Sequence, residues 1–148
     1  MIKILFICHG NICRSPMAEF IFKKIVSDNK LTKEFEISSA ATSREEIGND
    51  IYYLAKECLI KHNIPINKHI ARQINITDLE YFDHIIAMEE YNISNLRRLL
   101  GDSSKYSLLL DYTDKPGDID DPWYTGDFET AYSQIEKGCI ALLSEMLK

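Results

Sequence analysis

IKILFICHGNICRSP, residues 2–16, joins an apolar run to a short loop crowded with polar and sulfur-bearing side chains. Apart from Lys3, the first seven residues are apolar, a pattern typical of a strand buried on both faces of a parallel sheet. Pro16 suits the first turn of a helix that starts directly after the loop. The stretch therefore predicts a strand, a tight loop and a helix in immediate succession.

The rest of the chain repeats this alternation. Apolar residues recur at helical spacing in residues 17–26, 50–62, 92–101 and 128–146. Short apolar runs predict three further strands, at residues 35–41, 83–88 and 106–110. The segment between the last strand and the last helix, rich in Asp, Gly and Pro, is expected to be a loop. Strands separated by helices pair in parallel with right-handed crossovers. We therefore expect a doubly wound α/β domain over residues 1–148, a four-stranded parallel sheet with helices on both faces.

Composition narrows the classes of function. With 148 residues, 45% of them hydrophobic and 27% charged, the chain has the make-up of a globular domain with a full core. Its net charge of −6 argues against a nucleic-acid partner. No apolar run approaches the roughly 20 residues of a membrane span, and no signal-peptide pattern is evident. We expect a cytoplasmic protein with neither nucleic-acid nor membrane partners.

The cysteines and histidines do not suggest a metal centre. Four cysteines, at positions 8, 13, 58 and 139, are expected to be reduced in a chain without an export signal. Zinc is not expected, because Cys8 and Cys13 have no second Cys or His pair and the four histidines are scattered. No metal and no cofactor are predicted.

The loop after the first strand has the composition of an oxyanion site. CHGNICR is a Cys-x5-Arg stretch at the carboxyl end of a strand, where ligands bind in such folds. Its backbone N–H groups can converge on one point, the following helix adds a positive dipole end, and Arg14 offers a planar fork for two phosphate oxygens. Cys8 would be stabilised there as a thiolate that attacks phosphorus, with Ser15 donating to it when it departs.

Two other kinds of functional loop do not match the residues of this loop. A Walker-type phosphate loop requires a second glycine and a lysine, and a thioredoxin-like site requires C-x-x-C. The single glycine, Gly10, suits a backbone position that needs positive φ or close approach to a ligand. Asn11 is one of the few other residues that tolerate the left-handed region.

A phosphatase also needs an acid to protonate the departing oxygen. DIDDPWYTGD, residues 118–127, places four aspartates at the same edge of the predicted sheet. Asp121 precedes Pro122, which is expected to hold it extended, off any helix and free to point into a cleft. Trp123 and Tyr124 could form apolar walls for a ring. From the residues alone, Asp120 remains an alternative acid, and a solvated turn remains the alternative for any single aspartate.

Six motifs resemble, in order, the low-molecular-weight protein tyrosine phosphatases. They are CHGNICRSP, SSAATS, EIGN, HIARQI, FDHIIAMEEYN and DDPWYTGDFE. The resemblance spans the whole chain and implies a flavodoxin-like fold. It also implies metal-free hydrolysis of phosphotyrosine through a phosphocysteine intermediate, with phosphotyrosine proteins or peptides as substrates and inorganic phosphate as a product inhibitor.

The resemblance assigns roles to individual residues. Cys8 matches the nucleophile, Arg14 the phosphate clamp and Asp121 the general acid. Cys13 matches a second loop cysteine that can form a reversible disulfide with the nucleophile. The hydrogen-bond network that shapes the loop is matched by Asn11, Ser15, Ser39 and His69. The loop residues from His9 to Ser15, together with Trp123 and Tyr124, are expected to bind substrate.

Some positions depart from the family pattern. His9 stands where many relatives carry an apolar or small residue, and Glu45 stands where an aromatic substrate wall is expected. Glu89 replaces an expected aspartate that helps to hold Arg14. Ile12 occupies the position at which relatives acting on phosphoarginine carry threonine, so it favours aryl phosphates.

Two other functions remain open. A thioredoxin-coupled arsenate reductase shares the fold and the anion loop, but it would need two further thiols near the site. Residues 88–100 contain none, and Cys58 and Cys139 lie in other predicted helices. A catalytically silent phosphate-binding module is the third possibility, which the presence of Cys8, Arg14 and Asp121 makes unnecessary.

Overall fold

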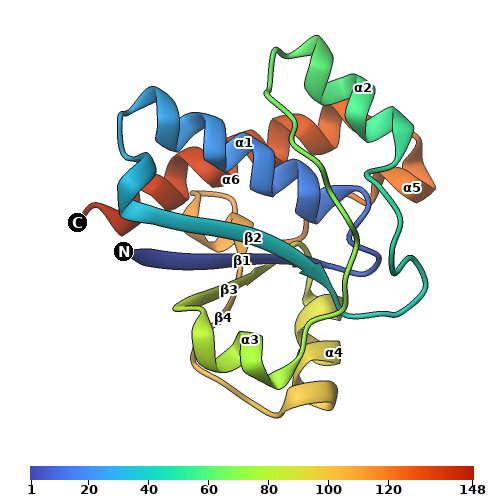
Figure 1. Ribbon diagram of the computed structural model, residues 1–148, viewed down its shortest axis with the longest axis vertical. Helices are drawn as coiled ribbons and strands as arrows, with labels where there is room; N and C mark the ends of the chain where they lie inside the picture. The colour runs from blue at the N-terminus through green and yellow to red at the C-terminus, as the bar shows by residue number, and fades with distance from the viewer.

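In the computed structural model, which describes residues 1–148, the apolar run at the start of the chain forms β1 (Ile2–Cys8). Beside it lie β2 (Phe35–Ala41) and β3 (His84–Ala87), and β4 (Tyr106–Leu108) pairs with β3 at the edge. The strand order is β2-β1-β3-β4 and every pairing is parallel (Figure 1). The predicted four-stranded parallel sheet is therefore confirmed.

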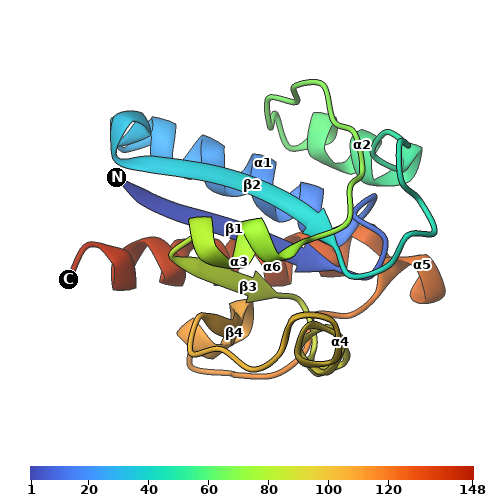
Figure 2. The ribbon, with the colours of Figure 1, turned by 60° about the horizontal axis from the view of Figure 1, so that its bottom comes forward.

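Helices cover both faces of this sheet (Figure 1 and Figure 2). One face carries α1 (Arg14–Asp28), α2 (Tyr53–Lys61) and α6 (Phe128–Met146). The other carries α3 (Ile76–Tyr81) and α4 (Glu90–Leu100). The short helix α5 (Pro122–Thr125) lies beyond the carboxyl ends of the strands, and two 3-10 turns are η1 (Thr32–Glu34) and η2 (Leu109–Tyr112). No helix combines the length and apolar character that crossing a bilayer would demand.

The side chains of β1 serve two separate cores. Ile4 and Phe6 belong to a cluster of 30 buried residues that includes the inner faces of α1, α2 and α6. Leu5 and Ile7 belong to a cluster of 10 on the opposite face. Successive side chains of a strand point to opposite faces, so a strand covered on both sides must be apolar throughout. This explains the uninterrupted run that opens the sequence.

The connections place Cys8 at the point where the winding of the sheet reverses. From β1 the chain moves outward to β2 and then returns across β1 to β3. Beyond the strand ends the Met88 amide still bonds to the Ile7 carbonyl at 3.1 Å, which keeps the two carboxyl ends together. Ligands of open α/β sheets bind at such a switch point, between the two strands whose connections diverge.

The element boundaries differ from the predicted ones at two places near the site. The first helix starts at Arg14, three residues before the apolar stripe at 17–26, so Arg14 lies in the first turn together with Pro16, whose place there was predicted. The fourth strand ends at Leu108, because the next residues wind into η2 and the Leu108 amide bonds to the Asp111 carboxylate at 3.1 Å.

Two short helices, α3 and α5, were not expected from periodicity. α3 starts with a capping box in which the Asn75 side chain accepts from the Asp78 amide, and the Asp78 side chain accepts from the Asn75 amide. The Asn-x-x-Asp spacing is the sequence signal for it. A six-residue helix is too short to show an apolar stripe.

Gly138 provides a test of the packing between α6 and η2. A Cβ atom at Gly138 would lie 2.5 Å from Cγ of Leu109, whose side chain is fully buried. Gly138→Ala should therefore lower the melting temperature. Overpacking costs on the order of 1–3 kcal/mol, against a gain of roughly 1 kcal/mol in helix propensity. Ser144→Ala, at an exposed position of the same helix, is the control. An unchanged or higher melting temperature for Gly138→Ala would contradict this packing.

Candidate active site

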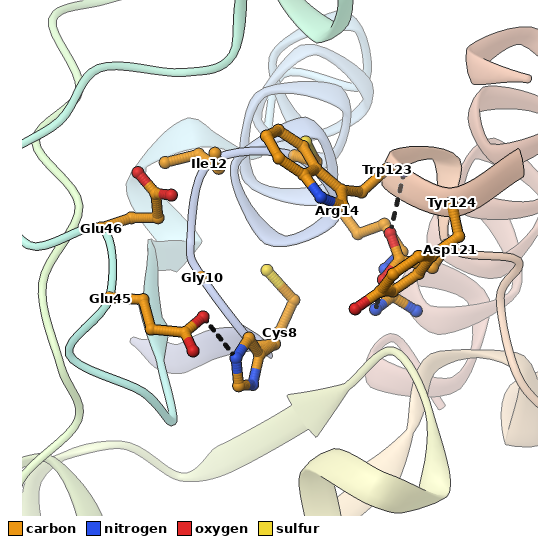
Figure 3. Close-up of a pocket in the computed structure, with 11 residues that line it drawn as sticks. Cys8, Gly10, Ile12, Arg14, Glu45, Glu46, Asp121, Trp123 and Tyr124 are labelled. Atoms are coloured by element: carbon orange, nitrogen blue, oxygen red, sulfur yellow. Dashed lines mark hydrogen bonds and ion pairs between the residues drawn. The ribbon is translucent and has the colours of Figure 1, made fainter. Parts of the chain in front are cut away.

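A pocket of about 200 Å³ opens at the carboxyl end of β1, and the Cys8 side chain points into it (Figure 3). Ten of its eleven lining residues are positions that the sequence singled out, and Glu46 is the exception. The lining comprises Cys8, His9, Gly10, Ile12, Cys13, Arg14, Glu45, Glu46, Asp121, Trp123 and Tyr124. Residues from the first loop, the segment after β2 and α5 thus meet around one thiol.

Two hydrogen-bond donors converge on the sulfur of Cys8. The Asn11 amide points at Sγ from 3.2 Å, and Ser15 Oγ lies 3.0 Å from it. Ser15 Oγ already accepts a hydrogen bond from Asn11 Nδ2 at 2.8 Å, so its own hydrogen is left for the sulfur. Donors aimed at one atom stabilise negative charge on it.

Asn11 holds the loop in this shape. It is fully buried, and its side-chain nitrogen donates to Ser15 Oγ and, at 3.0 Å, to Ser39 Oγ. Its side-chain oxygen accepts from the Arg72 amide at 3.2 Å, and its carbonyl accepts from His69 Nε2 at 2.7 Å. Because a carbonyl only accepts, His69 must carry a hydrogen on Nε2. Two distant segments, β2 and residues 69–72, are therefore tied to one loop residue.

Of the two reasons that the sequence offered for Gly10, a positive φ or close approach to a ligand, the structure excludes the first. The residue with positive φ is Asn11, at 60°, and Gly10 has no positive φ. Asparagine tolerates the left-handed region, which the bonds to its side chain and carbonyl stabilise here. A Cβ at Gly10 would lie 3.4 Å from Cγ of Glu46, an ordinary contact, so the space at this position does not by itself require a glycine.

Arg14 is a buried cation held from one side. Its Nη1 donates to Glu89 at 3.0 Å and to the Ile119 carbonyl at 2.8 Å, and its Nη2 donates to Asp121 at 3.2 Å. Burial works against the charge, but the hydrogen bond to Glu89 and the nearby Cys8 and Asp121 outweigh it and raise the Arg14 pKa. The guanidinium is therefore a fixed positive charge in the pocket.

Asp121 is extended, lies outside the helix that follows and lines the pocket, as predicted; its role as a helix cap was not predicted. It is the N-cap of α5: one oxygen accepts from the Trp123 amide at 3.0 Å, and the other from Arg14. Pro122 supplies the first residue of that helix, a position where its missing N–H costs nothing. Asp120 is exposed and does not line the pocket. The structure thus brings Asp121, and not Asp120, to the site.

The rim of the pocket is aromatic on one side. Trp123 and Tyr124 line it with exposed side chains, and the Trp123 ring packs against Tyr52 at 4.9 Å between centroids. The Tyr52 amide in turn bonds to the Ile12 carbonyl at 2.8 Å, which links this wall to the loop. Tyr52 was not predicted, because its place beside the pocket depends on contacts with a segment more than 70 residues away.

The opposite rim is acidic. His9 Nε2 and a Glu45 carboxylate oxygen lie 2.8 Å apart, the pair marked on the left of the thiol in Figure 3. Glu46 follows Glu45 and faces the same space. Two of the positions that depart from the family pattern, His9 and Glu45, are therefore partners of each other at the mouth.

Several predicted residues stand behind the pocket and do not line it. Asn11 and Ser15, expected to bind substrate, are fully buried and contact the thiol instead. Ser39 accepts from Asn11 and donates to the buried carboxylate of Glu19 at 2.6 Å. Sequence reasoning missed Glu19, although an acid one helical turn after Ser15 on an apolar face was a usable signal.

The remaining thiols differ in position. Cys13 lines the pocket. Its pKa is well above the ordinary value, mainly because the thiol is buried and to a smaller extent because Cys8 is close to it. Burial raises the pKa of Cys58, to about 12, and that of Cys139 as well. Cys58 contacts the Phe128 carbonyl and Cys139 the Ala18 carbonyl, so neither reaches the pocket. The disulfide between Cys8 and Cys13 that the resemblance implies stays a prediction.

Comparison with known proteins identifies the family. The profile described as "Low molecular weight phosphotyrosine protein phosphatase" matches residues 3–148. The protein of that name from chicken (Gallus gallus) is 44% identical over 150 residues, which cover 97% of this chain and 94% of the chicken chain. The chain belongs to the low-molecular-weight protein tyrosine phosphatase family. It is therefore an enzyme of the phosphatase class, as the sequence predicted.

Solved structures of this phosphatase family agree with the fold. The crystal structure of YfkJ from Bacillus subtilis superposes with a TM-score of 0.96 at 40% identity, covering 99% of this chain and 95% of that one. A Drosophila protein described as an arginine phosphatase superposes with a TM-score of 0.89 at 30% identity, over 99% of each chain. The flavodoxin-like fold is confirmed, and the arsenate reductase alternative finds no support.

The contact from Ser39 to Asn11 provides a test of the loop network in this phosphatase. Ser39→Ala removes one of the bonds that orient Asn11, a loss of about 1 kcal/mol. We expect kcat/KM for a small aryl phosphate to fall about 5–10-fold, with the fold retained. Ser38→Ala changes the neighbouring, partly exposed residue of β2 and should have little effect. Equal kinetics for the two variants would mean that Ser39 does not position the loop.

Proposed function

We propose that this phosphatase hydrolyses phosphotyrosine by two displacements at Cys8. In the first, Cys8 Sγ forms a bond to phosphorus, the bond from phosphorus to the phenolic oxygen breaks, and Asp121 gives its proton to that oxygen. In the second, water attacks the phosphocysteine, the S–P bond breaks, and Asp121 takes up a proton from the water. The observation that carries the proposal is the convergence of two donors on a buried thiol beside a buried arginine.

Arg14 is proposed as the clamp for the phosphoryl oxygens. Its Nη1 is occupied by Glu89 and the Ile119 carbonyl, which hold the guanidinium plane. Its Nη2 bonds to Asp121, which also lines the pocket, and a phosphate dianion would compete for that position. Substrate binding would then release Asp121 from Arg14 and leave its carboxyl facing the leaving oxygen. Fixed donors that meet charge developing in the transition state are the largest single contribution in many enzymes.

The pocket walls favour an aryl substrate. Trp123 and Tyr124 offer ring faces at the rim and Ile12 an apolar side chain, which suit the phenyl ring of phosphotyrosine. Glu45 and Glu46 at the mouth would repel acidic residues beside the phosphotyrosine, so peptides with basic or neutral neighbours should fit best. Phosphotyrosine proteins or peptides are the proposed partners, and inorganic phosphate, which fits the same cradle, the proposed product inhibitor.

A reducing compartment suits this mechanism. All four cysteines are free, and the proposed nucleophile must stay reduced to act. Disulfides persist mainly in oxidising compartments, so free thiols support a cytoplasmic location.

Replacement of Cys8 tests the proposed nucleophile. Cys8→Ser should abolish hydrolysis of aryl phosphates but keep the affinity for inorganic phosphate or vanadate, because the cradle and Arg14 remain. The wild-type protein should keep its activity in EDTA, since none of the proposed steps uses a metal. Steady-state assays measure the hydrolysis with and without EDTA, and an anion-binding titration measures the affinity. Substantial turnover by the serine variant, or loss of activity on chelation, would contradict the mechanism.

Paired substitutions at Asp121 and Asp120 test the proposed acid. The phenol of tyrosine has a pKa of about 10, so its departure requires a proton, whereas nitrophenol leaves readily without one. Asp121→Asn should slow phosphotyrosine hydrolysis on the order of 10²–10⁴-fold and nitrophenyl phosphate hydrolysis much less. Asp120→Asn is the matched control, at an exposed position outside the pocket. The same loss on both substrates, or a larger loss for the control, would remove Asp121 from this role.

A further inference from the structure

Cys58, His62 and Glu129 form a side-chain cluster between α2 and α6, outside the active-site pocket. Cys58 and His62 are one helical turn apart, so they face the same way, and Glu129 comes from the first turn of α6. His62 Nε2 lies 2.7 Å from one Glu129 oxygen and Cys58 Sγ 3.7 Å from the other. The three ligand atoms all lie within 4.8 Å of one another.

We propose that this cluster binds a zinc-class divalent cation. A tetrahedral zinc ion takes sulfur, nitrogen and oxygen ligands at about 2.0–2.3 Å, which places neighbouring ligand atoms about 3.3–3.8 Å apart. The 3.7 Å between Cys58 Sγ and one Glu129 oxygen already fits, and because His62 contacts the other oxygen, the carboxylate would have to rotate to bring a single oxygen to the ion. The distance from His62 to Glu129 would have to open by less than about 1 Å, which two half-exposed side chains permit.

The ligand types select the class of metal. A thiolate, an imidazole and a carboxylate suit zinc, whereas magnesium and calcium prefer oxygen ligands alone. When the ion binds, an S–metal bond forms at Cys58 and the thiol proton passes to solvent, because a coordinated thiol is deprotonated. The N–metal bond at His62 Nε2 replaces the N–H that faces Glu129, and the neutral imidazole then carries its hydrogen on Nδ1. Three protein ligands leave the fourth position for a water molecule.

The ligands are held in place by the surrounding structure. The His62 ring stacks on the buried Tyr132 ring at 3.8 Å and 10°, which limits its rotation. Cys58 is 5% exposed, and its thiol makes only long contacts, at 3.7 Å, to Glu129 and to the Phe128 carbonyl. Lys61 pairs with Glu129 at 3.7 Å, but its exposed side chain can swing into solvent.

Sequence spacing could not reveal this site. His62 and Glu129 are 67 residues apart, and the single Cys-x3-His pair has no second pair to match it. The expectation of no metal was based on Cys8, Cys13 and scattered histidines, and none of those considerations concerned the packing of α2 on α6.

A bound ion would fasten α2 to α6 and thereby support the pocket wall. Tyr52, the residue before α2, packs against both Phe128 at the start of α6 and Trp123 on the rim. The expected effect is therefore on stability, and it is independent of the proposed chemistry at Cys8.

Cobalt titration of the reduced, metal-free Cys8→Ser protein tests the proposal, because this variant lacks the proposed nucleophilic thiol, and Cys58→Ser then distinguishes the cluster from Cys13, the thiol that remains in the pocket. We expect one Co²⁺ per chain, a thiolate-to-cobalt charge-transfer band and the intense visible bands of a tetrahedral ion, all displaced by Zn²⁺. In the same background, Cys58→Ser should abolish the charge-transfer band. His62→Gln and Glu129→Gln should each weaken binding at least about tenfold. Glu57→Gln, an exposed carboxylate on α2, is the control.

Thermal unfolding gives the second measurement. Zn²⁺ at about 100-fold above its Kd should raise the melting temperature of the Cys8→Ser protein by about 5 °C or more. At the same Zn²⁺ concentration the rise should persist with Glu57→Gln and fall to about half or less with His62→Gln, which keeps a hydrogen-bonding side chain at a partly exposed position. A missing charge-transfer band, a band that survives Cys58→Ser, an affinity unchanged by His62→Gln, or no rise in melting temperature would each overturn the proposal.

Discussion

The hydrogen bonds of Asn11 determine the shape of the loop on which the active site depends. Its left-handed backbone turns its own amide towards Cys8, while its side chain fixes Ser15 and Ser39. Its remaining polar atoms are tied to the segment at residues 69–72. A buried asparagine whose polar groups are all paired is rigid, since any other loop conformation would leave several of them unsatisfied. The cradle is therefore formed before any anion arrives.

The elements on either side of this loop hold Cys8 and Arg14 in place. β1 is buried on both faces, so Cys8 at its end cannot shift without disturbing both cores. Arg14, in the first turn of α1, is almost completely buried, and such a cation is tolerated only because Glu89, Ile119 and Asp121 occupy its donors. An entering phosphate would replace one of these partners and leave the other two in place. The site can thus exchange a carboxylate for a phosphate with little rearrangement.

Periodicity and composition predicted the sheet, the long helices and the Cys-x5-Arg cradle, because these depend on local sequence. Features that depend on distant contacts were missed or misassigned. The sequence named both Gly10 and Asn11 as residues that tolerate a positive φ and could not choose between them; it falls on Asn11, whose carbonyl is held by His69, 58 residues away. Asp121 caps a helix whose Asp-Pro start and Gly126 end are readable in the sequence, but four residues give no periodicity. Tyr52 and the cluster at Cys58 depend on how α2 packs against α6, which no local pattern records.

A crystal structure of the protein with orthovanadate tests most directly the claim that the loop is already shaped for a phosphoryl group. We expect vanadium bonded to Cys8 Sγ, with the loop amides and Arg14 on its oxygens. The bonds of Asn11, and those from Arg14 to Glu89 and Ile119, should be unchanged, and the bond from Arg14 to Asp121 should be lost. Vanadate bound away from Cys8, or a loop in which Asn11 has left its left-handed conformation and its partners, would contradict the account.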